Sequence, residues 1–409
     1  MNILPEVRAL AEEILPTLED RFAELDRLAM DNTERVLDAF QAERVSESMF
    51  SGTTGYGYDD IGRDTLDRIY ARVFGAEAAL VRIGFVNGTH AIAAALFAAL
   101  APGDRLLSLT GLPYDTIRTV IGIEGDAVGS LKYYGIGYCQ CDMDEDPAPY
   151  LADPAVRAVL IQRSRGYDLR RALCVEELEQ RIARVKQLRP DVFVIVDNCY
   201  GEFTQRREPT ACGADLCAGS LIKNPGGGLA LTGGYICGSK ELVERAAYRL
   251  TVPGIGAECG ASLGQNRAMY QGLFVAPHVT VQALKTAVFC SRMLSRLGFA
   301  TSPDAMEERG DIVQTITLGS ADRLVRFCAG VQAASPVDAY VSPEPWQMPG
   351  YDCEVVMASG AFVSGSTSEL GCDGPLREPY VAYMQGGLTK EAGFLGVMSA
   401  ISSMLAQRE

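Results

Sequence analysis

The chain of 409 residues contains little histidine and little lysine, and each shortage excludes a class of function. It has two histidines, His90 and His278, and its 12 cysteines form no C-x-x-C pair. Zinc sites are built from clusters of such ligands, so we expect no metal site. The chain has six lysines and a formal net charge of −15. Nucleic acids and anionic membranes attract clustered Lys and Arg side chains, so we expect neither as a partner.

Long apolar runs are also missing. No segment reaches the roughly 18 uninterrupted apolar residues of a membrane helix. The N-terminal stretch MNILPEVRALAEEILP carries charges where a signal peptide has its apolar centre. We therefore expect a cytoplasmic protein whose cysteines are reduced thiols. The length exceeds that of one compact core, and it predicts two domains.

The clearest chemical pattern lies in residues 192–228. The run VFVIV is β-branched and aromatic, which is typical of a strand buried on both faces, and the strand ends on the carboxylate of Asp197. Lys223 follows 26 positions later (223 − 197), directly before the run NPGGG. Pyridoxal phosphate needs such a pair, because it is held as a Schiff base on a lysine and an acid faces its ring nitrogen. The pattern therefore predicts a pyridoxal-phosphate site, where desolvation is expected to lower the pKa of the lysine.

The surroundings of Lys223 support this reading. Ser220 lies three residues before Lys223 and is expected to offer its hydroxyl to the cofactor phosphate. The glycines allow the backbone to approach the cofactor closely. Four of the other lysines fall in helix-like segments, and Lys132 precedes two tyrosines. The alternative is an acid that merely ends a core strand and a lysine in a surface loop.

Several longer motifs carry a family resemblance. The stretches VDNCYGEF, GSLIKNPGGG and TGGYICG resemble the Cys/Met-metabolism group of fold-type-I pyridoxal-phosphate enzymes. More closely, TGYGYDDIGRDTLDRIYA, PGIGAECGA, ASPVDAYVSPEPW and PYVAYMQGGLT resemble its aluminium-resistance (methionine γ-lyase-like) branch. The resemblance covers nearly the whole chain. It implies that Lys223 carries the cofactor and that Asp197 faces the pyridine nitrogen.

The expected fold is α/β. Alternating strands and helices predict a doubly wound, mostly parallel sheet in a large domain. The resemblance implies a sheet of the seven-stranded type in residues 51–285 and a smaller α+β domain in residues 286–409. Residues 1–50 have helical periodicity, which alone predicts an ordinary packing helix. The resemblance implies that they form an arm that lies on a partner subunit.

Four further positions are expected to hold the cofactor. Gly88 and Thr89 open an apolar helix, where free N–H groups and the helix dipole favour a phosphate. The resemblance implies that Tyr114 stacks on the cofactor ring and that Gln162 lies near its phenolic oxygen. A plain helix cap and an aromatic side chain packed on the core are the alternatives.

The glycine-rich segment 51–64 reads as a loop. In the family that the chain resembles, the matching loop supplies a tyrosine and an arginine to the phosphate in the neighbouring subunit. Tyr58 matches the tyrosine, Asp60 occupies the position of the arginine, and Arg63 is the substitute candidate. Such a loop would make each active site a product of two chains, so we expect a homodimer or homotetramer. The alternative is a solvated surface loop.

Three arginines are candidates for binding a substrate carboxylate. Arg163 and Arg165 follow a predicted strand, at the carboxyl edge where open α/β sheets bind ligands. The family commonly places an arginine on its last strand, where Tyr383 stands in this chain, and Arg377 is the nearest substitute. The alternative for each is a solvated loop arginine.

These expectations converge on a lyase that uses pyridoxal phosphate to break a carbon–sulfur bond of an amino acid by β- or γ-elimination. Lys223 would also remove the Cα proton as general base. Asp115 and Thr116 stand where the γ-lyases usually carry a cysteine. Two alternatives remain open: another pyridoxal-phosphate reaction, such as transamination, racemisation or replacement, or a non-catalytic stress or resistance protein that retains the fold.

Overall fold

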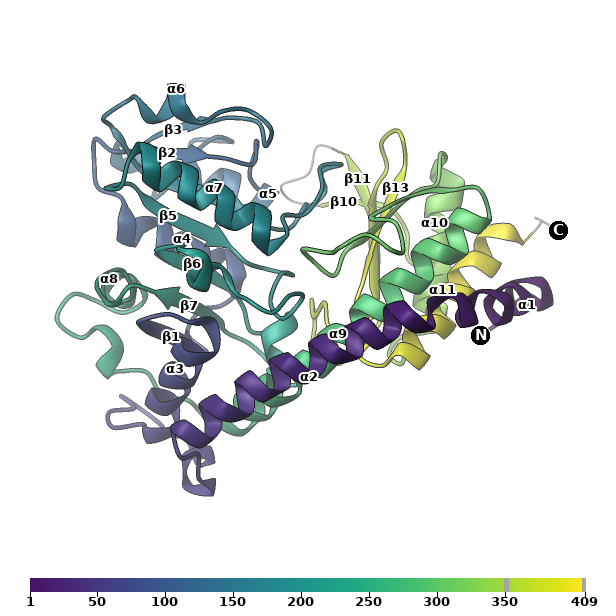
Figure 1. Ribbon diagram of the computed structural model, residues 1–409, viewed down its shortest axis with the longest axis horizontal. Helices are drawn as coiled ribbons and strands as arrows, with labels where there is room; N and C mark the ends of the chain where they lie inside the picture. The colour runs from purple at the N-terminus through teal and green to yellow at the C-terminus, as the bar shows by residue number, and fades with distance from the viewer. Residues whose placement is uncertain (349–352, 407–409) are drawn as a thin grey trace.

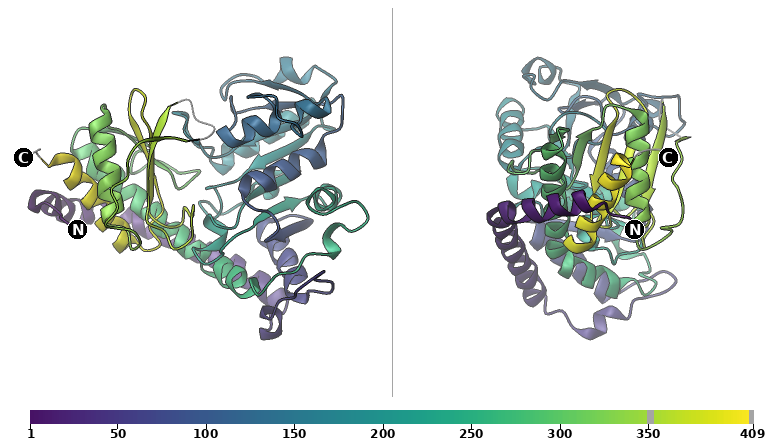
Figure 2. Two further views of the ribbon diagram at one scale, coloured as in Figure 1. Left: turned by 180° about the vertical axis from the view of Figure 1, so that it is seen from behind. Right: turned by 90° about the vertical axis from the view of Figure 1, so that its right-hand side faces the viewer.

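The computed structural model describes residues 1–348 and 353–406 of the chain, so residues 349–352 and 407–409 of the expected small domain lie outside it. Two sheets form separate lobes, and two long helices bridge them along one side (Figures 1 and 2). The larger lobe holds a seven-stranded sheet and the smaller lobe a six-stranded one. This arrangement confirms the predicted α/β class with its smaller α+β part.

The seven-stranded sheet has the order β1-β7-β6-β5-β4-β2-β3. Its strands are β1 (Ala78–Arg82), β2 (Arg105–Ser108), β3 (Gly137–Gln140), β4 (Val156–Gln162), β5 (Phe193–Asp197), β6 (Leu216–Ser220) and β7 (Gly234–Gly238). Only β7 runs against its neighbours β6 and β1, so the sheet is mostly parallel, as predicted. The central strands β5 and β6 are almost wholly buried, because helices cover both faces.

The covering helices fall into two layers. Residues of α3 and α7 pack on one face of the large sheet, and residues of α4, α5 and α8 pack on the other. The bounds are α3 (Ile61–Phe74), α4 (Gly88–Ala99), α5 (Asp115–Ile121), α6 (Ala148–Leu151), α7 (Val175–Leu188) and α8 (Lys240–Leu250). Parallel strands end at the same edge of a sheet, so Gln162, Asp197 and Ser220 come to one rim.

The small sheet is antiparallel, with the order β10-β11-β12-β13-β9-β8. Its strands are β8 (Ala300–Ser302), β9 (Gln314–Thr317), β10 (Trp346–Gln347), β11 (Glu354–Ser359), β12 (Gly371–Pro375) and β13 (Val381–Gln385). One face packs on α10 (Ala321–Ala333) and α11 (Lys390–Leu405) through side chains such as Cys372 and Met384. Side chains of a strand alternate between faces, so the neighbours of these residues turn to the other face.

The bridging helices are α2 (Glu19–Ala42) and α9 (Asn266–Arg296), which pack against each other. By length and composition α9 could cross a membrane, but 83% of its most apolar window is buried inside the protein, which is typical of a core helix. The N-terminal α1 (Pro5–Ile14) and the start of α2 bury Val7 and Leu25 in the small-domain core. Within one chain, the predicted arm therefore covers its own small domain.

Candidate active site

Lys223 stands on a tight turn at the rim of the large sheet. β6 ends at Ser220, and the turn closes with the short 3-10 helix η5 (Asn224–Gly226). A Cβ on Gly226 would lie 1.7 Å from the carbonyl oxygen of Leu221, so only glycine fits at that position. The hydroxyl of Ser368, from the small domain, donates to the carbonyl oxygen of Lys223 at 3.2 Å. The turn therefore holds Lys223 between the two lobes.

Two cavities meet at Lys223. The first, of about 230 Å³, we call the Asp197 cavity; among its lining residues are Gly88, Thr89, Tyr114, Gln162, Asp197, Ser220 and Lys223. The second, of about 240 Å³, we call the Asp373 cavity, and it extends from Lys223 to the small-domain sheet. Tyr114, Ser164, Gly166, Tyr200 and Lys223 line both. The structure thus brings together seven of the side chains and backbone positions predicted from the sequence.

The Asp197 cavity offers an anion site at the start of α4. The side chain of Asn87 caps this helix by accepting from the N–H of His90 at 2.9 Å. Gly88 is closely surrounded, since a Cβ there would lie 3.2 Å from both the Sγ of Cys199 and the Cβ of Ser220. The helix α4 is twelve residues long, and a glycine and hydroxyl groups lie beside its N-terminus. Such a helix start suits a phosphate group.

The opposite part of this cavity carries the buried carboxyl of Asp197. Its Oδ1 accepts from the N–H of Cys199 at 3.1 Å. Burial raises the pKa of the Asp197 carboxyl, while the Cys199 hydrogen bond and the charge of Lys223 oppose that rise. A protonated ring nitrogen would favour the charged carboxylate at this place, because a buried anion gains most from a close cation. The cavity therefore fits both ends of pyridoxal phosphate: the start of α4 suits the phosphate, and the Asp197 carboxylate suits the ring nitrogen.

The electrostatics of Lys223 differ from the sequence-based expectation. Its Nζ lies 4.1 Å from the ring centroid of Tyr200. Burial lowers the pKa of the amine, but the neighbouring groups Tyr200, Cys199 and Glu202 outweigh burial and raise it. The expected lowering by desolvation alone was wrong, because acidic neighbours surround the amine. Tyr200 was missed from the sequence, although it follows Asp197 by three positions in the motif DNCY.

Comparisons with known proteins agree with this geometry. The family model described as methionine gamma-lyase matches residues 7–405. The chain belongs to the methionine gamma-lyase family. It is 46% identical to the uncharacterized protein YnbB of Bacillus subtilis (strain 168), over 98% of this chain and 97% of that protein.

Solved structures of the same kind superpose closely. A carbon–sulfur lyase involved in aluminum resistance from Clostridium novyi NT has a TM-score of 0.94 and 50% identity, covering 98% of this chain and 96% of that one. A protein of Clostridium acetobutylicum, provisionally named cystathionine beta-lyase involved in aluminum resistance, has a TM-score of 0.96 and 47% identity, covering 99% and 97%. The pyridoxal-5'-phosphate dependent protein YhfS of Escherichia coli shares the fold, with a TM-score of 0.62 and 18% identity over 92% and 96% of the two chains.

Arg163 does not serve as a substrate ligand in this member of the methionine gamma-lyase family, which corrects the expectation from its place after β4. Its side chain is fully buried and lines neither cavity. The guanidinium instead donates to five acceptors that join separate loops: the oxygens of Leu173, Asn198, Gly201, Thr204 and Gln205. These bonds give Arg163 a structural role beneath the site.

Arg165 and Arg377 also lie outside the lining of the two cavities. The Nη1 of Arg165 donates to Ser302 and Thr315 of the small domain, so Arg165 ties the lobes together. Its Nε and Nη2 have no hydrogen-bond partner among the described residues, and its predicted role in substrate binding stays a prediction. Arg377 follows β12 in an exposed loop and lines a neighbouring cavity of about 230 Å³ that Tyr167 and Tyr383 share with the Asp373 cavity. Its predicted role in substrate binding stays a prediction.

The loop expected to reach a neighbouring subunit is set apart from Lys223 within one chain. Tyr58 is 55% exposed and stacks on Tyr56, and neither lines the two cavities. Arg63 is buried, and its Nη1 donates to the carbonyl oxygens of Gly57 and Gly260 at 2.6 and 2.8 Å. These bonds fasten the loop within one chain, and the predicted role of Arg63 at the phosphate of a neighbouring subunit stays a prediction.

Asp60 is likewise used inside the loop. It is the N-cap of α3, and its carboxylate accepts from the backbone of Arg63 and from three side chains, those of Thr53, Ser262 and Asn266. Burial would raise its pKa, but these donors outweigh burial and lower it. Asp60 is therefore a buried structural anion, and its charge is turned into the protein.

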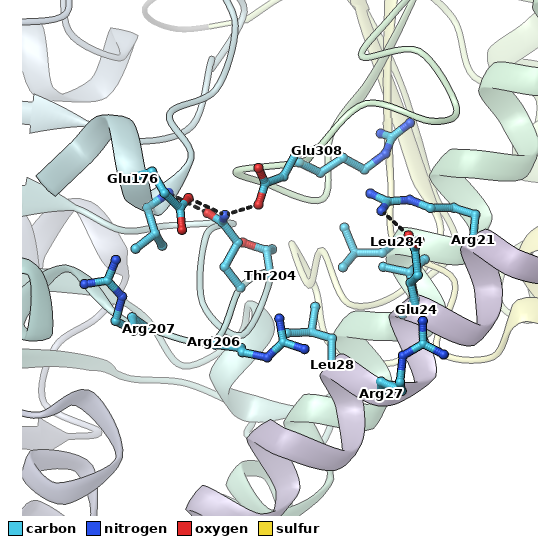
Figure 3. Close-up of a pocket in the computed structure, with 14 residues that line it drawn as sticks. Arg21, Glu24, Arg27, Leu28, Glu176, Thr204, Arg206, Arg207, Leu284 and Glu308 are labelled. Atoms are coloured by element: carbon cyan, nitrogen blue, oxygen red, sulfur yellow. Dashed lines mark hydrogen bonds and ion pairs between the residues drawn. The ribbon is translucent and has the colours of Figure 1, made fainter. Parts of the chain in front are cut away.

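A larger cavity of about 460 Å³ lies elsewhere, between α2 and the segment 204–207 (Figure 3). Arginines and glutamates dominate its lining, and several are paired with each other or with neighbours, such as Arg21 with Glu24 at 2.8 Å and Arg207 with Glu179 at 2.8 Å. Its lining includes no lysine, tyrosine, histidine or cysteine among the described residues. The reactive groups are gathered at Lys223, so size alone does not identify the site.

Proposed function

We propose that this chain is a pyridoxal-phosphate-dependent lyase that breaks a carbon–sulfur bond, at Cβ or Cγ, of a sulfur-containing amino acid. One observation carries the proposal: the amine of Lys223 lies where a cavity suited to the cofactor meets a second cavity of similar volume. The names of the close structural relatives support the reaction class.

In this proposal the Asp197 cavity holds the cofactor. Gly88, Thr89 and Ser220 would hold its phosphate, Tyr114 would support its ring, and Asp197 would favour protonation of its ring nitrogen. Gln162 supports Tyr114, because its Oε1 accepts from the Tyr114 N–H at 2.7 Å. When bound, the cofactor takes up the electrons that the Cα–H bond leaves behind.

The chain itself moves the protons. Lys223 accepts the Cα proton at Nζ and can return it to the departing group or to the product. Tyr200 is half-buried beside Nζ, and desolvation raises the pKa of its hydroxyl, which keeps it neutral and able to donate.

A decisive experiment combines spectroscopy with product analysis. Purified protein loaded with pyridoxal phosphate should show a visible absorbance band that Lys223→Ala abolishes, whereas Lys240→Ala, at an exposed lysine on α8, should leave it unchanged. Incubation with cysteine, cystathionine and methionine should release sulfide or a thiol together with a 2-oxo acid. A band without any such product would instead favour another pyridoxal-phosphate reaction or a non-catalytic protein.

We further propose a cytoplasmic homodimer or homotetramer in which Tyr58 reaches the phosphate of a neighbouring subunit. The exposed Tyr56–Tyr58 pair supports this assembly, because exposed aromatic side chains are common at interfaces. Subunit mixing provides the test: Lys223→Ala and Tyr58→Ala proteins, each impaired alone, should regain activity when refolded together. No recovery, or a monomeric mass in light scattering, would contradict the shared site.

A further inference from the structure

The far wall of the Asp373 cavity is one face of the small-domain sheet. Asp373 on β12 pairs with Tyr383 on β13 and with Met357 on β11, and Gly371 pairs with Gln385. Directly paired residues point to the same face, and so do residues two apart along a strand. Their neighbours Cys372 and Met384 point to the core face instead. The sheet therefore presents Asp373 to the cavity together with Tyr383 and Gln385.

The charges of this cavity are unusual for the site of an amino acid. Among the described lining residues, Lys223 is the only cation and Asp373 the only anion. Gly371, two residues before Asp373 on the same face, leaves space that the side-chain amide of Gln385 occupies, since a Cβ on Gly371 would lie 3.3 Å from the Nε2 of Gln385.

The carboxylate of Asp373 is held in place. Tyr167, from the large domain, and Gln385 donate hydrogen bonds to it. A carboxylate has about four lone-pair sites, so two donors leave capacity for a further partner. Lys223 also lies within electrostatic range of Asp373. Burial raises the pKa of the carboxyl to about 6, against the lowering effect of Tyr167, Gln385 and Lys223, so the group is mostly charged at neutral pH.

We propose that Asp373 binds a cationic group at the far end of the substrate side chain, so that this lyase prefers thioether amino acids bearing a second ammonium group. The inference rests on the proposed function: Lys223 receives the α-amino end, and Asp373 receives the distal end across the same cavity. A distal ammonium can pair with the Asp373 carboxylate, a neutral end leaves that carboxylate without a cationic partner from the substrate, and a distal carboxylate is repelled by it.

Three matched compounds test this preference. S-(2-aminoethyl)-L-cysteine ends in a cation, S-propyl-L-cysteine replaces that ammonium by a methyl group, and S-carboxymethyl-L-cysteine ends in an anion. With the holoenzyme, kcat/KM for the aminoethyl compound should exceed that for the propyl compound by about 30-fold or more, the size expected for one charge partner of a buried pair. Asp373→Asn should bring the ratio to within about threefold of one.

The control is Glu354→Gln on the adjacent strand β11, which removes the same charge at an exposed position and should keep the wild-type ratio. A second measurement avoids turnover. In the Lys223→Ala background, calorimetry with the same three compounds should give the same order of Kd, and adding Asp373→Asn should abolish that order.

Each outcome separates the two proposals. If these compounds release no thiol and cysteine, cystathionine and methionine give no 2-oxo acid either, the proposed function fails. If cysteine or methionine reacts but none of the three compounds does, the lyase stands and the preference for a distal cation is wrong. If all three react at equal rates, or if Asp373→Asn slows all three equally, the lyase stands but Asp373 does not select a distal cation. Equal slowing would place the carboxylate at the α-amino end that the three compounds share.

Discussion

The two walls of the site are built in different ways. The large-domain wall, which we call the strand-end wall, consists of strand ends. The strands β4, β5 and β6 each end on one polar side chain: Gln162, Asp197 and Ser220. The small-domain wall, which we call the sheet-face wall, is one face of an antiparallel sheet. Asp373 and Tyr383 are neighbours there because their strands pair. The first wall suits a cofactor common to many reactions, and the second suits the part of a substrate that differs between them.

The largest effect should come from the strand-end wall. Replacing the carboxylate in Asp197→Asn keeps the size of the side chain but removes the charge that faces the cofactor ring. We expect kcat to fall by about 10²- to 10³-fold, as for the loss of one preorganised electrostatic group. Steady-state kinetics of the loaded enzyme measures this. The exposed Asp191→Asn serves as control, and an unchanged kcat in Asp197→Asn would remove the carboxylate from the mechanism.

The strand-end wall is also the part that the sequence could predict. Asp197, Ser220 and Lys223 lie within one local motif in which a buried strand is followed by a glycine-rich turn. Arg163 follows the same kind of strand and was predicted wrongly. Its acceptors come from residues 173 and 198–205, and the direction of its side chain depends on how these distant loops pack.

The sheet-face wall could not be predicted in the same way. β12 has the sequence GCDGP, whose glycines, aspartate and proline have low strand propensity. It becomes a strand because β11 and β13 pair with it on both sides. Whether Asp373 faces the cavity or the core depends on that register, since a slip of one residue would reverse the face. No local pattern in the sequence contains this information.

Arg163 should affect stability rather than substrate binding. Arg163→Met removes one of the two charge partners of Glu208, whose carboxylate lies 3.8 Å from Arg163 and 3.4 Å from Arg35, and takes one donor from each of five acceptors. We expect the free energy of unfolding to fall by about 3–5 kcal/mol, with KM of the remaining folded enzyme unchanged. Denaturant unfolding and kinetics at low temperature measure the two quantities. A raised KM with normal stability would instead restore Arg163 as a substrate ligand.

Gly88 tests the space left for the cofactor on the strand-end wall. The methyl group of Gly88→Ala would lie 3.2 Å from Cys199 and Ser220, beside the proposed phosphate position. We expect cofactor affinity to fall by about tenfold, because crowding of this kind typically costs about 1–3 kcal/mol. Absorbance titration with pyridoxal phosphate measures the Kd. Gly84→Ala, whose methyl group would make ordinary contact at 3.6 Å, should bind as the wild type does.

The smallest expected effect is a pH dependence of the substrate preference, which should come from Asp373 on the sheet-face wall and not from the strand-end wall. Burial raises the pKa of Asp373 to about 6, so its carboxyl is charged above that pH and neutral below it. The preference for a cationic thioether should therefore be present at pH 7 to 8 and be lost as the pH falls through about 6.

The other titratable groups that line this cavity are Lys223 and the tyrosines Tyr114, Tyr167, Tyr200 and Tyr383. The pKa values of Lys223, Tyr200 and Tyr383 are raised, so these groups do not change charge in that range. The ratio of kcat/KM for S-(2-aminoethyl)- and S-propyl-L-cysteine, measured from pH 5 to 8, should follow one titration in the wild type. In Asp373→Asn it should stay flat, because the strand-end wall acts equally on both compounds; a pH dependence that survives this substitution would assign the selectivity to a different group.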